Sequence, residues 1–462
     1  MFKKTSKDVG LRIIIVGCGK VGMTLIEQLS KEGHDVTIID QNSQKIQEIT
    51  NIFDIMGIVG NGASYSVQQE AGIEDADLII AVTESDELNL LCCTIASQVG
   101  NCAAIARVRT PDYSKEVGYL REKLGLALII NPELETAKEA SRILYLPTAL
   151  EVSSFAHGQA ELIKIKLPAD TMLDGMTIAD LGRRFQRNIL ICGIERDGEV
   201  YIPSGAFTLL AGDIISIVGT DRECRSFLQQ IGFATKQVKN TMIVGGGRAA
   251  YYLADQLLHM GIKVKIIESD RNRCEELSIL LPNAIIINGD GTNQELLKEE
   301  GIETVESFVP LTGIDEENVM LTLYAKQASN AKVITKINRI NFKNVFTQLD
   351  LGSVLYPKYI TCEMIIAYVR ARRNSSSSNS IDTLYHLFDY RVEAIEFHVN
   401  KESAATNIPF KDLSTKDHLL IAFISRKGSI IIPTGQDCIR VGDSVMVVTT
   451  HNGLHDIVDI LK

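Results

Sequence analysis

Short apolar runs alternate with longer amphipathic stretches through the first part of the chain. Helical patterns, such as the one from Gly22 to Lys31, separate these runs. Strands of a parallel sheet are buried on both faces and are joined by crossover helices, so the alternation predicts a sheet of βαβ units. The predicted strands lie at about 12–16, 36–39, 55–59, 78–82 and 104–108.

The same alternation returns later in the chain at a nearly constant offset. Gly17 and Asp40 recur as Gly245 and Glu268, each 228 positions later. The turn at 203–205, Pro-Ser-Gly, recurs 230 positions later as Pro-Thr-Gly. A register that holds across such unlike motifs indicates a duplicated two-domain unit. The predicted strands of the second copy lie near 241–244, 263–267, 284–287, 307–311 and 332–336.

After each parallel-sheet region the pattern changes to alternating strands and turns. The runs at 160–166 and 393–399 are examples, and they indicate a small α+β domain after each sheet. We therefore predict an α/β chain with two Rossmann-like parallel-sheet domains, each followed by a small α+β domain. The predicted boundaries are 1–150 and 237–372 for the Rossmann domains and 151–236 and 381–462 for the small domains.

The boundary before the last domain is rich in Arg and Ser. Residues 370–374 read Arg-Ala-Arg-Arg-Asn, and four serines follow at 375–378. This composition is typical of a flexible, exposed linker, so the second small domain is expected to move more freely than the first. The arginines are interpreted as a solvated helix end, with a cationic ligand site as the alternative.

Composition argues against several classes of function. The 462 residues carry a net charge of −11, which gives no electrostatic reason to expect nucleic acid or anionic lipid as a partner. No apolar run approaches the roughly 18 residues of a transmembrane helix, and no signal peptide is recognised, so a cytoplasmic location is expected. The nine cysteines include no CxxC pair and the histidines form no ligand-spaced cluster. We therefore predict no disulfide framework and no metal site, with most cysteines in the core.

The first copy opens with a glycine-rich turn between a strand and a helix. Gly17, Gly19 and Gly22 fit the tight turn, the close backbone approach and the helix packing of a dinucleotide site. Amides at the start of the helix would meet the pyrophosphate. Asp40 would accept hydrogen bonds from the ribose hydroxyls and repel a 2′-phosphate, so NAD(H) is favoured over NADP(H). The alternative role for Asp40 is a helix N-cap.

The second copy carries a variant of the same turn. Gly245 and Gly247 are followed by Ala250, an accepted third residue of this motif, and Glu268 supplies the acid. Arg248 either adds a cation beside the phosphates or points to solvent. The two sites are therefore free to prefer different nucleotides.

Further motifs follow both glycine turns in the same order. Residues 81–89 and 105–113 of the first copy correspond to 311–318 and 335–339 of the second. On these motifs the chain resembles the tandem RCK family, the regulators of potassium conductance, over essentially its whole length. The resemblance implies a homodimer or homotetramer whose domains form a ring under an integral membrane potassium transport subunit of the Trk type. It also implies a peripheral location on the cytoplasmic face of the membrane. Binding of NAD(H), and of ATP or ADP, would change the ring and gate potassium transport.

The resemblance also implies roles for individual residues. Asn61 and Gly62 would line the adenine end, Thr83 and Glu84 would contact the ligand at a strand end, and Arg107 would face the phosphates. The family usually has Gly-Asp at the third strand end, and the Asn61 departure places the adenine contact of the first site in question. The other candidates are Cys18, Lys20 and Val21 in the first glycine turn, and Arg248, Ala249, Asp290, Gly291, Thr312 and Lys336 in the second copy.

No catalytic motif occurs in both copies, so we predict a regulatory protein without catalytic residues. Tyr119 and Lys123 match the YxxxK spacing of short-chain dehydrogenases but are interpreted as an ordinary helix face. One alternative is an NAD-dependent oxidoreductase with one catalytic and one regulatory half. Another is a cytosolic sensor without a channel partner. The small domains either bind an ion or second messenger or only dimerise, and the equivalent turn positions of Asp213 and Asp443 favour a structural role.

Overall fold

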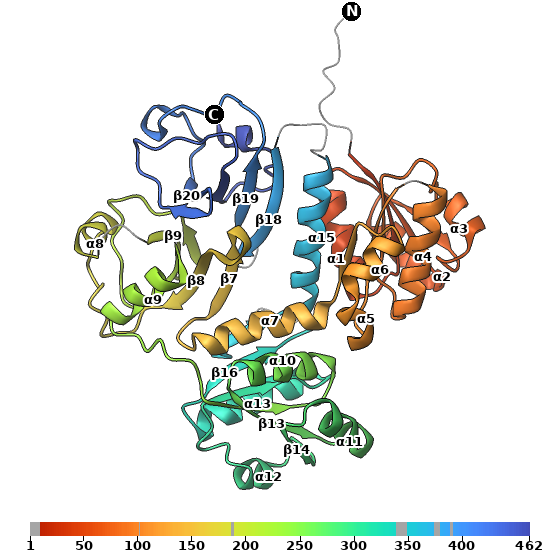
Figure 1. Cartoon of the computed structure of the whole chain (residues 1–462), viewed down its shortest axis with the longest axis horizontal. Coiled ribbons are helices and arrows are strands. Elements are labelled where there is room, and N and C mark those ends of the chain that lie inside the picture. Colours follow the sequence, from red (N-terminus) through yellow and green to blue (C-terminus); the bar gives the residue numbers. More distant parts are fainter. Residues whose placement is uncertain (1–9, 101, 186–188, 339–348, 374–378, 389–390) are drawn as a thin grey trace, which may run out of the picture. The chain divides into compact units, whose positions relative to one another are not determined.

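The first Rossmann domain, drawn in red to orange in Figure 1, contains a six-stranded parallel sheet. The order of its strands is β3-β2-β1-β4-β5-β6. The computed structural model describes residues 10–100, 102–185, 189–338, 349–373, 379–388 and 391–462. The strands are β1 Arg12–Val16, β2 Asp35–Asp40, β3 Met56–Val59, β4 Leu78–Ala81, β5 Ala103–Arg107 and β6 Leu128–Ile130. The helices are α1 Lys20–Lys31, α2 Ser43–Ile52, α3 Tyr65–Glu70, α4 Asp86–Val99, α5 Pro111–Lys115 and α6 Val117–Lys123.

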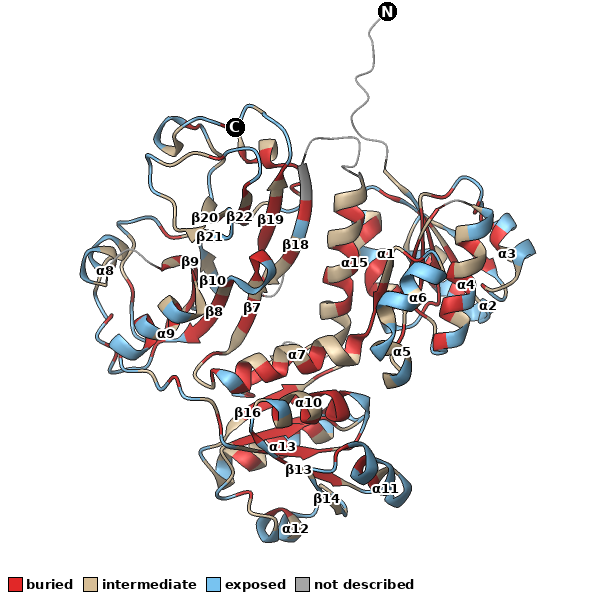
Figure 2. Ribbon diagram, viewed as in Figure 1, coloured by how far each residue is buried: buried red, intermediate tan, exposed pale blue. Residues whose placement is uncertain are grey.

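The second Rossmann domain repeats this sheet, with the order β14-β13-β12-β15-β16-β17. Its strands are β12 Asn240–Val244, β13 Lys263–Glu268, β14 Ile285–Asn288, β15 Ser307–Pro310, β16 Lys332–Lys336 and β17 Ser353–Leu355. Its helices are α10 Arg248–His259, α11 Arg271–Leu280, α12 Gln294–Glu299 and α13 Asp315–Ala328. The central strands are buried on both faces, as apolar runs of this kind require (Figure 2).

Each small domain is a five-stranded antiparallel sheet, and the two sheets have the same strand order. The first contains β7 Glu151–Phe155, β8 Ala160–Lys166, β9 Leu190–Arg196, β10 Glu199–Tyr201 and β11 Ile214–Gly219, with helices α8 Ile178–Arg184 and α9 Asp221–Gln230. The second contains β18 Asn379–Leu387, β19 Val392–Val399, β20 Leu419–Arg426, β21 Ser429–Ile431 and β22 Ser444–Thr449, with short 3-10 turns at Phe410–Asp412 and Ile457–Ile460. The predicted fold class is confirmed.

The chain divides into two compact units, and each of two long helices has residues in both units. Helix α15, Pro357–Arg373, contributes residues 357–366 to the unit that holds the first Rossmann domain. There Cys362 is buried, with its thiol 3.8 Å from the Val21 carbonyl of α1. Helix α7, Pro132–Tyr145, contributes its later part to the other unit, where Ser141 bonds to Gln256 of α10 at 2.9 Å. Each long helix therefore contacts the first helix of the Rossmann domain that it does not follow in sequence.

The interpretation of Arg370 as part of a solvated helix end is wrong. Its guanidinium is buried and donates to both carboxylate oxygens of Glu393, at 2.9 and 3.1 Å. The pKa of Glu393 is lowered: burial alone would raise it, but hydrogen bonds and charge from His386 and Arg370 outweigh burial. The serine-rich linker predicted at 374–378 lies outside the described residues.

The equivalent aspartates of the small domains hold matching turns. Asp213 pairs with Arg196, and Asp443 with Arg426, each through two bonds of 2.7 or 2.8 Å. Each carboxylate also accepts a backbone amide three residues earlier in the chain. These contacts agree with the predicted structural role.

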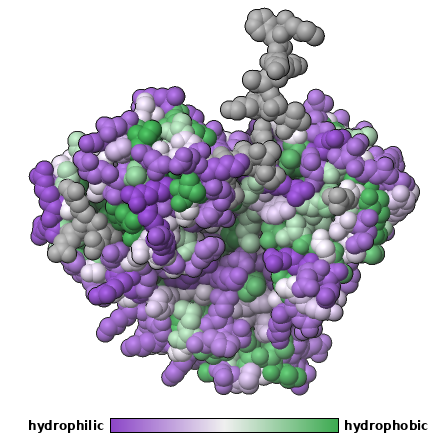
Figure 3. Space-filling view, turned by 45° about the horizontal axis from the view of Figure 1, so that its top comes forward, coloured by the Kyte–Doolittle hydropathy of each residue, from purple (hydrophilic) through white to green (hydrophobic). Residues whose placement is uncertain are grey.

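The cysteines lie mainly in the interior of the protein. Eight of the nine cysteines are buried and Cys438 is half-buried. One face of the molecule is mostly hydrophilic, with small hydrophobic patches (Figure 3). Among the helices that the structure describes, none is both long and apolar enough to cross a membrane.

Candidate functional site

The first glycine turn lies at the carboxyl end of β1, and its glycines meet different demands. Gly17 has φ +102°, and a Cβ there would lie 2.9 Å from the Thr83 amide nitrogen. A Cβ on Gly22 would lie 2.0 Å from the Gly17 carbonyl oxygen, so the helix packs directly on the turn. At Gly19 a Cβ would meet no described atom within 4 Å. The turn is therefore open at its second glycine, where the protein backbone is expected to lie close to a pyrophosphate.

The second glycine turn has the same geometry. Gly245 has φ +95°, and its Cβ would lie 3.1 Å from the Leu311 carbonyl. Gly247 is open within 4 Å among the described atoms, and Ala250 is fully buried in α10. The methyl group of alanine is thus accommodated at the third position.

Both turns present the start of a helix without a competing acid. Helix α1 begins at Lys20 after the N-cap Gly19, and α10 begins at Arg248 after the N-cap Gly247. Neither N-cap makes a side-chain hydrogen bond, and neither first turn contains Asp or Glu. The first amides of such a helix and its dipole favour an anion. Lys20 and Arg248 are exposed, whereas Val21 and Ala249 are buried.

Asp40 is fixed by two backbone amides of neighbouring turns. Oδ2 accepts from the Cys18 amide at 2.7 Å, and Oδ1 accepts from the Asn42 amide at 2.9 Å. The N-cap of α2 is Asn42, which accepts from the Lys45 amide, so the N-cap alternative for Asp40 is wrong. The carboxylate thus stands beside the glycine turn with lone pairs left to accept further donors.

Glu268 repeats this arrangement in the second domain. Its Oε2 accepts from the Gly246 amide at 2.6 Å, and its Oε1 accepts from the Asp270 amide at 2.7 Å. Asp270 is the N-cap of α11, so here too the acid is separate from the cap. Arg273 adds a contact to this turn by donating to the Gly246 carbonyl at 2.7 Å.

Cys18 is the side chain between the first two glycines. It is buried, and burial together with the charge of Asp40 raises its pKa to about 12. The thiol therefore stays protonated near neutral pH and is a poor nucleophile. Its contribution to the site is its backbone amide and its volume.

The loop after the third strand passes close over the first strand in both domains. A Cβ on Gly62 would lie 2.2 Å from Val16 Cγ1, and one on Gly291 would lie 2.2 Å from Val244 Cγ1. Asn61 accepts from the Ala63 amide at 3.0 Å. Asp290 accepts from the amide and hydroxyl of Thr292, and these hydrogen bonds lower its pKa. Asn61 therefore keeps the turn contact of an aspartate but lacks the charge.

Sequence reasoning missed a buried asparagine that ties two strand ends together. The Asn89 Oδ1 accepts from the Thr83 amide and hydroxyl, and its Nδ2 donates to the carbonyls of Thr83 and Arg107 at 3.2 and 2.9 Å. Asn318 makes the equivalent contacts with Thr312 and Lys336. The repeated Thr-to-Asn spacing of six residues was the available signal.

A buried glutamine, also missed, supports the loop of the first site alone. The Gln68 side chain is fully buried and donates to the carbonyls of Gly62 and Cys92 at 2.7 and 3.0 Å. Leu297 is buried at the equivalent position of the second domain. The two loops are thus held by different means.

The cations at the fifth strand end turn back toward the fourth strand. Arg107 Nη2 donates to the Thr83 carbonyl, and Lys336 Nζ donates to the Leu311 carbonyl at 3.0 Å. Burial and the neighbouring Arg109 lower the pKa of Arg107. Its Nε is buried and has no hydrogen-bond partner among the described residues. Glu84 is exposed beside this group, and its carbonyl accepts from Arg109.

A buried aspartate fixes the next loop. Asp86 accepts from the amides of Arg109 and Thr110 and from the Thr110 hydroxyl, at 2.7 to 2.9 Å. Burial would raise its pKa, but these hydrogen bonds outweigh burial and lower it. Asp315 accepts from the Asn338 amide and side chain in the second domain. The candidate residues of each half thus meet at the carboxyl ends of parallel strands, where open α/β sheets bind ligands.

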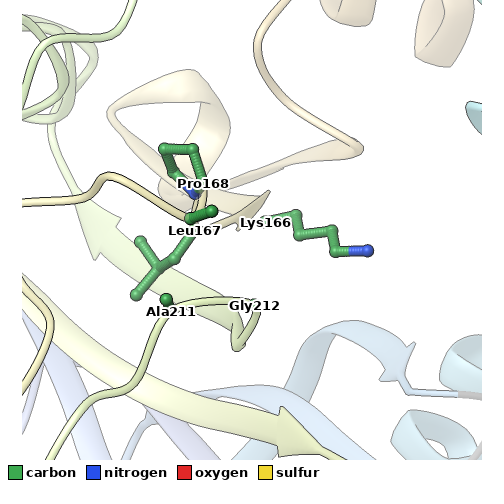
Figure 4. A pocket seen from close by; sticks show the side chains of 6 residues that line it. Lys166, Leu167, Pro168, Ala211 and Gly212 are labelled. Atoms are coloured by element: carbon green, nitrogen blue, oxygen red, sulfur yellow. The ribbon is translucent and has the colours of Figure 1, made fainter.

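Two surface features lie outside this strand-end arrangement. Tyr119 and Lys123 are on α6, where Tyr119 is 62% exposed and Lys123 pairs with Glu122, as expected of a helix face. A hollow of about 420 Å³ on the first small domain is lined by Lys166, Leu167, Pro168, Ala169, Ala211 and Gly212 (Figure 4). Its lining is mainly apolar and shares no residue with the candidate site.

Comparisons with known proteins match both halves of the chain. A family model described as the TrkA-N domain matches residues 13–132 and 241–357, and one described as the TrkA-C domain matches residues 162–232 and 394–462. The chain is 31% identical over 444 residues to the Trk system potassium uptake protein TrkA of Haemophilus influenzae, covering 95% of each chain. It is 31% identical over 452 residues to a TrkA homolog of Archaeoglobus fulgidus, covering 98% of this chain and 100% of the relative.

Solved structures support the fold. The crystal structure of the GsuK RCK domain superposes with a TM-score of 0.62 at 17% identity, covering 96% of this chain and 93% of that chain. The GsuK channel bound to NAD gives a TM-score of 0.63 at 17% identity, covering 96% of this chain and 78% of that chain. At this identity the likeness concerns the fold alone.

Proposed function

The chain belongs to the TrkA family, and from this premise we propose that it is a nucleotide-sensing regulatory subunit of a potassium uptake system. The observation that carries the proposal is the pair of glycine turns, each with an open side at its second glycine. Beside each turn a carboxylate is held by the turn's own amide.

The proposed ligand is NAD(H), with ATP or ADP as competitors for the same cradle. The diphosphate would lie against the amides at the starts of α1 and α10. Asp40 and Glu268 would accept the ribose hydroxyls and would repel a 2′-phosphate. A channel of the same fold has been solved bound to NAD, which supports this choice of ligand class. We propose the predicted site residues as the contacts of this ligand.

The proposed mechanism is a shift between two conformations. A ligand moves such an equilibrium only by the difference between its affinities for the two states. We propose that the subunit forms a ring as a homodimer or homotetramer and docks on a Trk-type membrane subunit at the cytoplasmic face. The chain would thus change shape on binding and would turn over no substrate.

Calorimetric titration of the full chain with NAD⁺, NADH, ATP and ADP tests the proposal. We expect Gly19→Asp to remove binding in the first half and Gly247→Asp to remove it in the second, because each places bulk and negative charge at the diphosphate. The double variant should bind none of the four nucleotides. Gly182→Asp is the matched control, since its Cβ also meets no described atom within 4 Å but it lies on α8 of a small domain.

Two outcomes would contradict the proposal. One is unchanged NADH affinity in both single variants and in the double variant. The other is steady turnover of a hydroxy acid with NAD⁺, followed at 340 nm, which would favour the oxidoreductase alternative.

A further inference from the structure

The two small domains of the chain share a hydrophobic core. Both belong to the same compact unit, and strand β20 of the second domain contacts β9 and β11 of the first. Phe155, Leu162 and Cys192 of the first domain pack in one cluster with Phe388, Phe423 and Met446 of the second. All six side chains are at most 2% exposed. The interface is therefore built like the interior of a single domain.

The interface is organised around two equivalent hairpin turns. Phe155 pairs with Ala160 across the β7–β8 turn, and Leu387 pairs with Val392 across the β18–β19 turn. This register makes Ala156 equivalent to Phe388, and both have φ 50°. Each turn reaches the partner domain at the same place: Arg391 donates to the Gly198 carbonyl, and Gln159 lies beside Gly428. The pairing thus has approximate two-fold symmetry.

The side chains that meet across this symmetry are not symmetric in size. The Phe388 ring lies on Gly193, where a Cβ would be 2.8 Å from Phe388 Cε2. The residue equivalent to Gly193 is Phe423, because each stands opposite β11 or β22 directly before the bulge. By the same symmetry the turn position that faces Phe423 is Ala156, and the Phe423 ring also packs edge-on against Phe155, with 6.4 Å between the ring centres. On one side a large turn residue, Phe388, meets a small strand residue, Gly193. On the other side the turn residue is small, Ala156, and the strand residue is large, Phe423.

The two turns also face different polar side chains of the partner domain. Glu396 is buried and accepts from the Ala156 amide at 3.0 and 3.1 Å and from the Ser444 hydroxyl at 2.6 Å. Its equivalent in the first domain is Lys164, whose ammonium lies 4.9 Å from the Phe388 ring centre and pairs with Glu151. An acid thus faces one turn and a base faces the other.

A third unequal contact lies at the edge of the interface. Arg391 forms an ion pair with Glu195 across the two domains. The equivalent positions in the reciprocal contact are Gln159 and Ser425, which carry no charge. The same two turns therefore make a charged contact in one direction only.

We propose that this surface selects an unlike partner: a first small domain accepts a second small domain and rejects another first domain. Two second domains would set Phe388 against Phe423, which a close-packed interface cannot hold. Two first domains would set Ala156 against Gly193 and leave a void. They would also set the Lys164 ammonium against the Ala156 amide, so that two donors face each other.

The selection has a consequence for assembly. Whether the partner comes from the same chain or from a second copy, every such contact joins a first domain to a second domain. Through this surface, copies of this chain therefore do not pair like domain with like domain, because shape and charge exclude a symmetric contact there. This inference does not depend on nucleotide binding.

Exchanging the key residues in the full chain tests the proposal. The variant A156F/G193F gives the first domain the residues of the second, and F388A/F423G gives the second domain the residues of the first. Each should lower the thermal unfolding midpoint by about 5 °C or more, since each creates a like pair. The fourfold variant restores an unlike pair in the opposite sense and should recover most of both losses. The control F227A lies in the separate core of the first domain and should not be rescued by A156F/G193F.

The fourfold variant tests the proposal even where a double variant does not fold. A fourfold variant that folds, with a midpoint near that of the wild type, supports the proposal. A fourfold variant that loses the sum of the two double variants overturns it. An unchanged midpoint in A156F/G193F also overturns it, because that domain would then tolerate Phe opposite Phe388.

Discussion

At the scale of single residues, one buried asparagine in each Rossmann domain joins two strand ends that carry candidate ligand contacts. Asn89 uses both its oxygen and its nitrogen on Thr83 and reaches the Arg107 carbonyl on the next strand. Its side chain is fully buried. Because every polar atom of the amide is engaged, the contact fixes the relative position of the two strand ends. We regard Asn89 and Asn318 as positioning residues of the proposed sites.

We expect Asn89→Ala to affect stability and ligand binding together. The Thr83 amide and the Arg107 carbonyl would lose a buried partner, which costs about 1–3 kcal/mol of unfolding free energy. NADH affinity in the first half should fall about tenfold or more, equivalent to about 1.4 kcal/mol. Urea unfolding and calorimetry measure the two effects.

Asn318→Ala is the matched control for this prediction. It should weaken the second half by a similar amount and leave the first half unchanged. A chain with Asn89→Ala that is destabilised but binds NADH normally in both halves would contradict the positioning role.

What the sequence could predict at this scale depends on the range of the interactions. The glycine turns and Asp40 were predictable, because their conformational demands are local and their spacing is distinctive. The environment of Arg370 was not predictable, because its partner Glu393 lies 23 residues away across a serine-rich stretch. The composition around Arg370 predicted a solvent-exposed side chain. In the structure the side chain is buried because it pairs with the carboxylate of Glu393.

At the scale of elements, the predicted strands match the structure except for one strand at the edge of each Rossmann sheet. β6 and β17 have three residues each, too few to establish a period in the sequence. The contacts of α7 and α15 could not be predicted either. Both helices are amphipathic, but the sequence does not say against which domain the apolar face packs.

The end of one element carries an unusual charge. Lys332 at the start of β16 is half-buried and donates to the Ala149 carbonyl. Burial of the ammonium, with the neighbouring charge of Lys326, lowers its pKa to about 7. An unfolded lysine has a pKa of about 10.4. Between these values the unfolded chain binds more protons than the folded chain, so stability should rise with pH across this window.

We expect Lys332→Met to flatten that rise. The wild-type slope from this group is at most about 1.4 kcal/mol per pH unit, which corresponds to one proton. Urea unfolding followed by circular dichroism between pH 7 and pH 10 measures the slope. Lys263→Met is the control, because Lys263 is exposed on β13. Equal slopes in the wild type and in Lys332→Met would contradict the lowered pKa.

At the scale of the whole molecule, the two copies have diverged unevenly. The Rossmann domains keep matching glycine turns, strand-end acids and positioning asparagines. The small domains instead differ at the positions where they meet, as at Gly193 and Phe423. The two copies thus share the framework of the proposed sites, with differences such as Asn61 and Asp290, whereas their small domains differ at the contact itself.

Under the proposed function, any effect of a nucleotide on transport passes through a Trk-type membrane subunit. With a net charge of −11, the chain should not bind vesicles of anionic lipid alone. It should bind vesicles that contain a Trk-type membrane subunit, and NADH should change potassium flux several-fold, since a few kcal/mol of differential affinity shifts a two-state equilibrium strongly. The double variant G19D/G247D should still bind these vesicles but lose the response to NADH. A response that persists in the double variant would place the sensor elsewhere, and binding to lipid alone would remove the need for a protein partner.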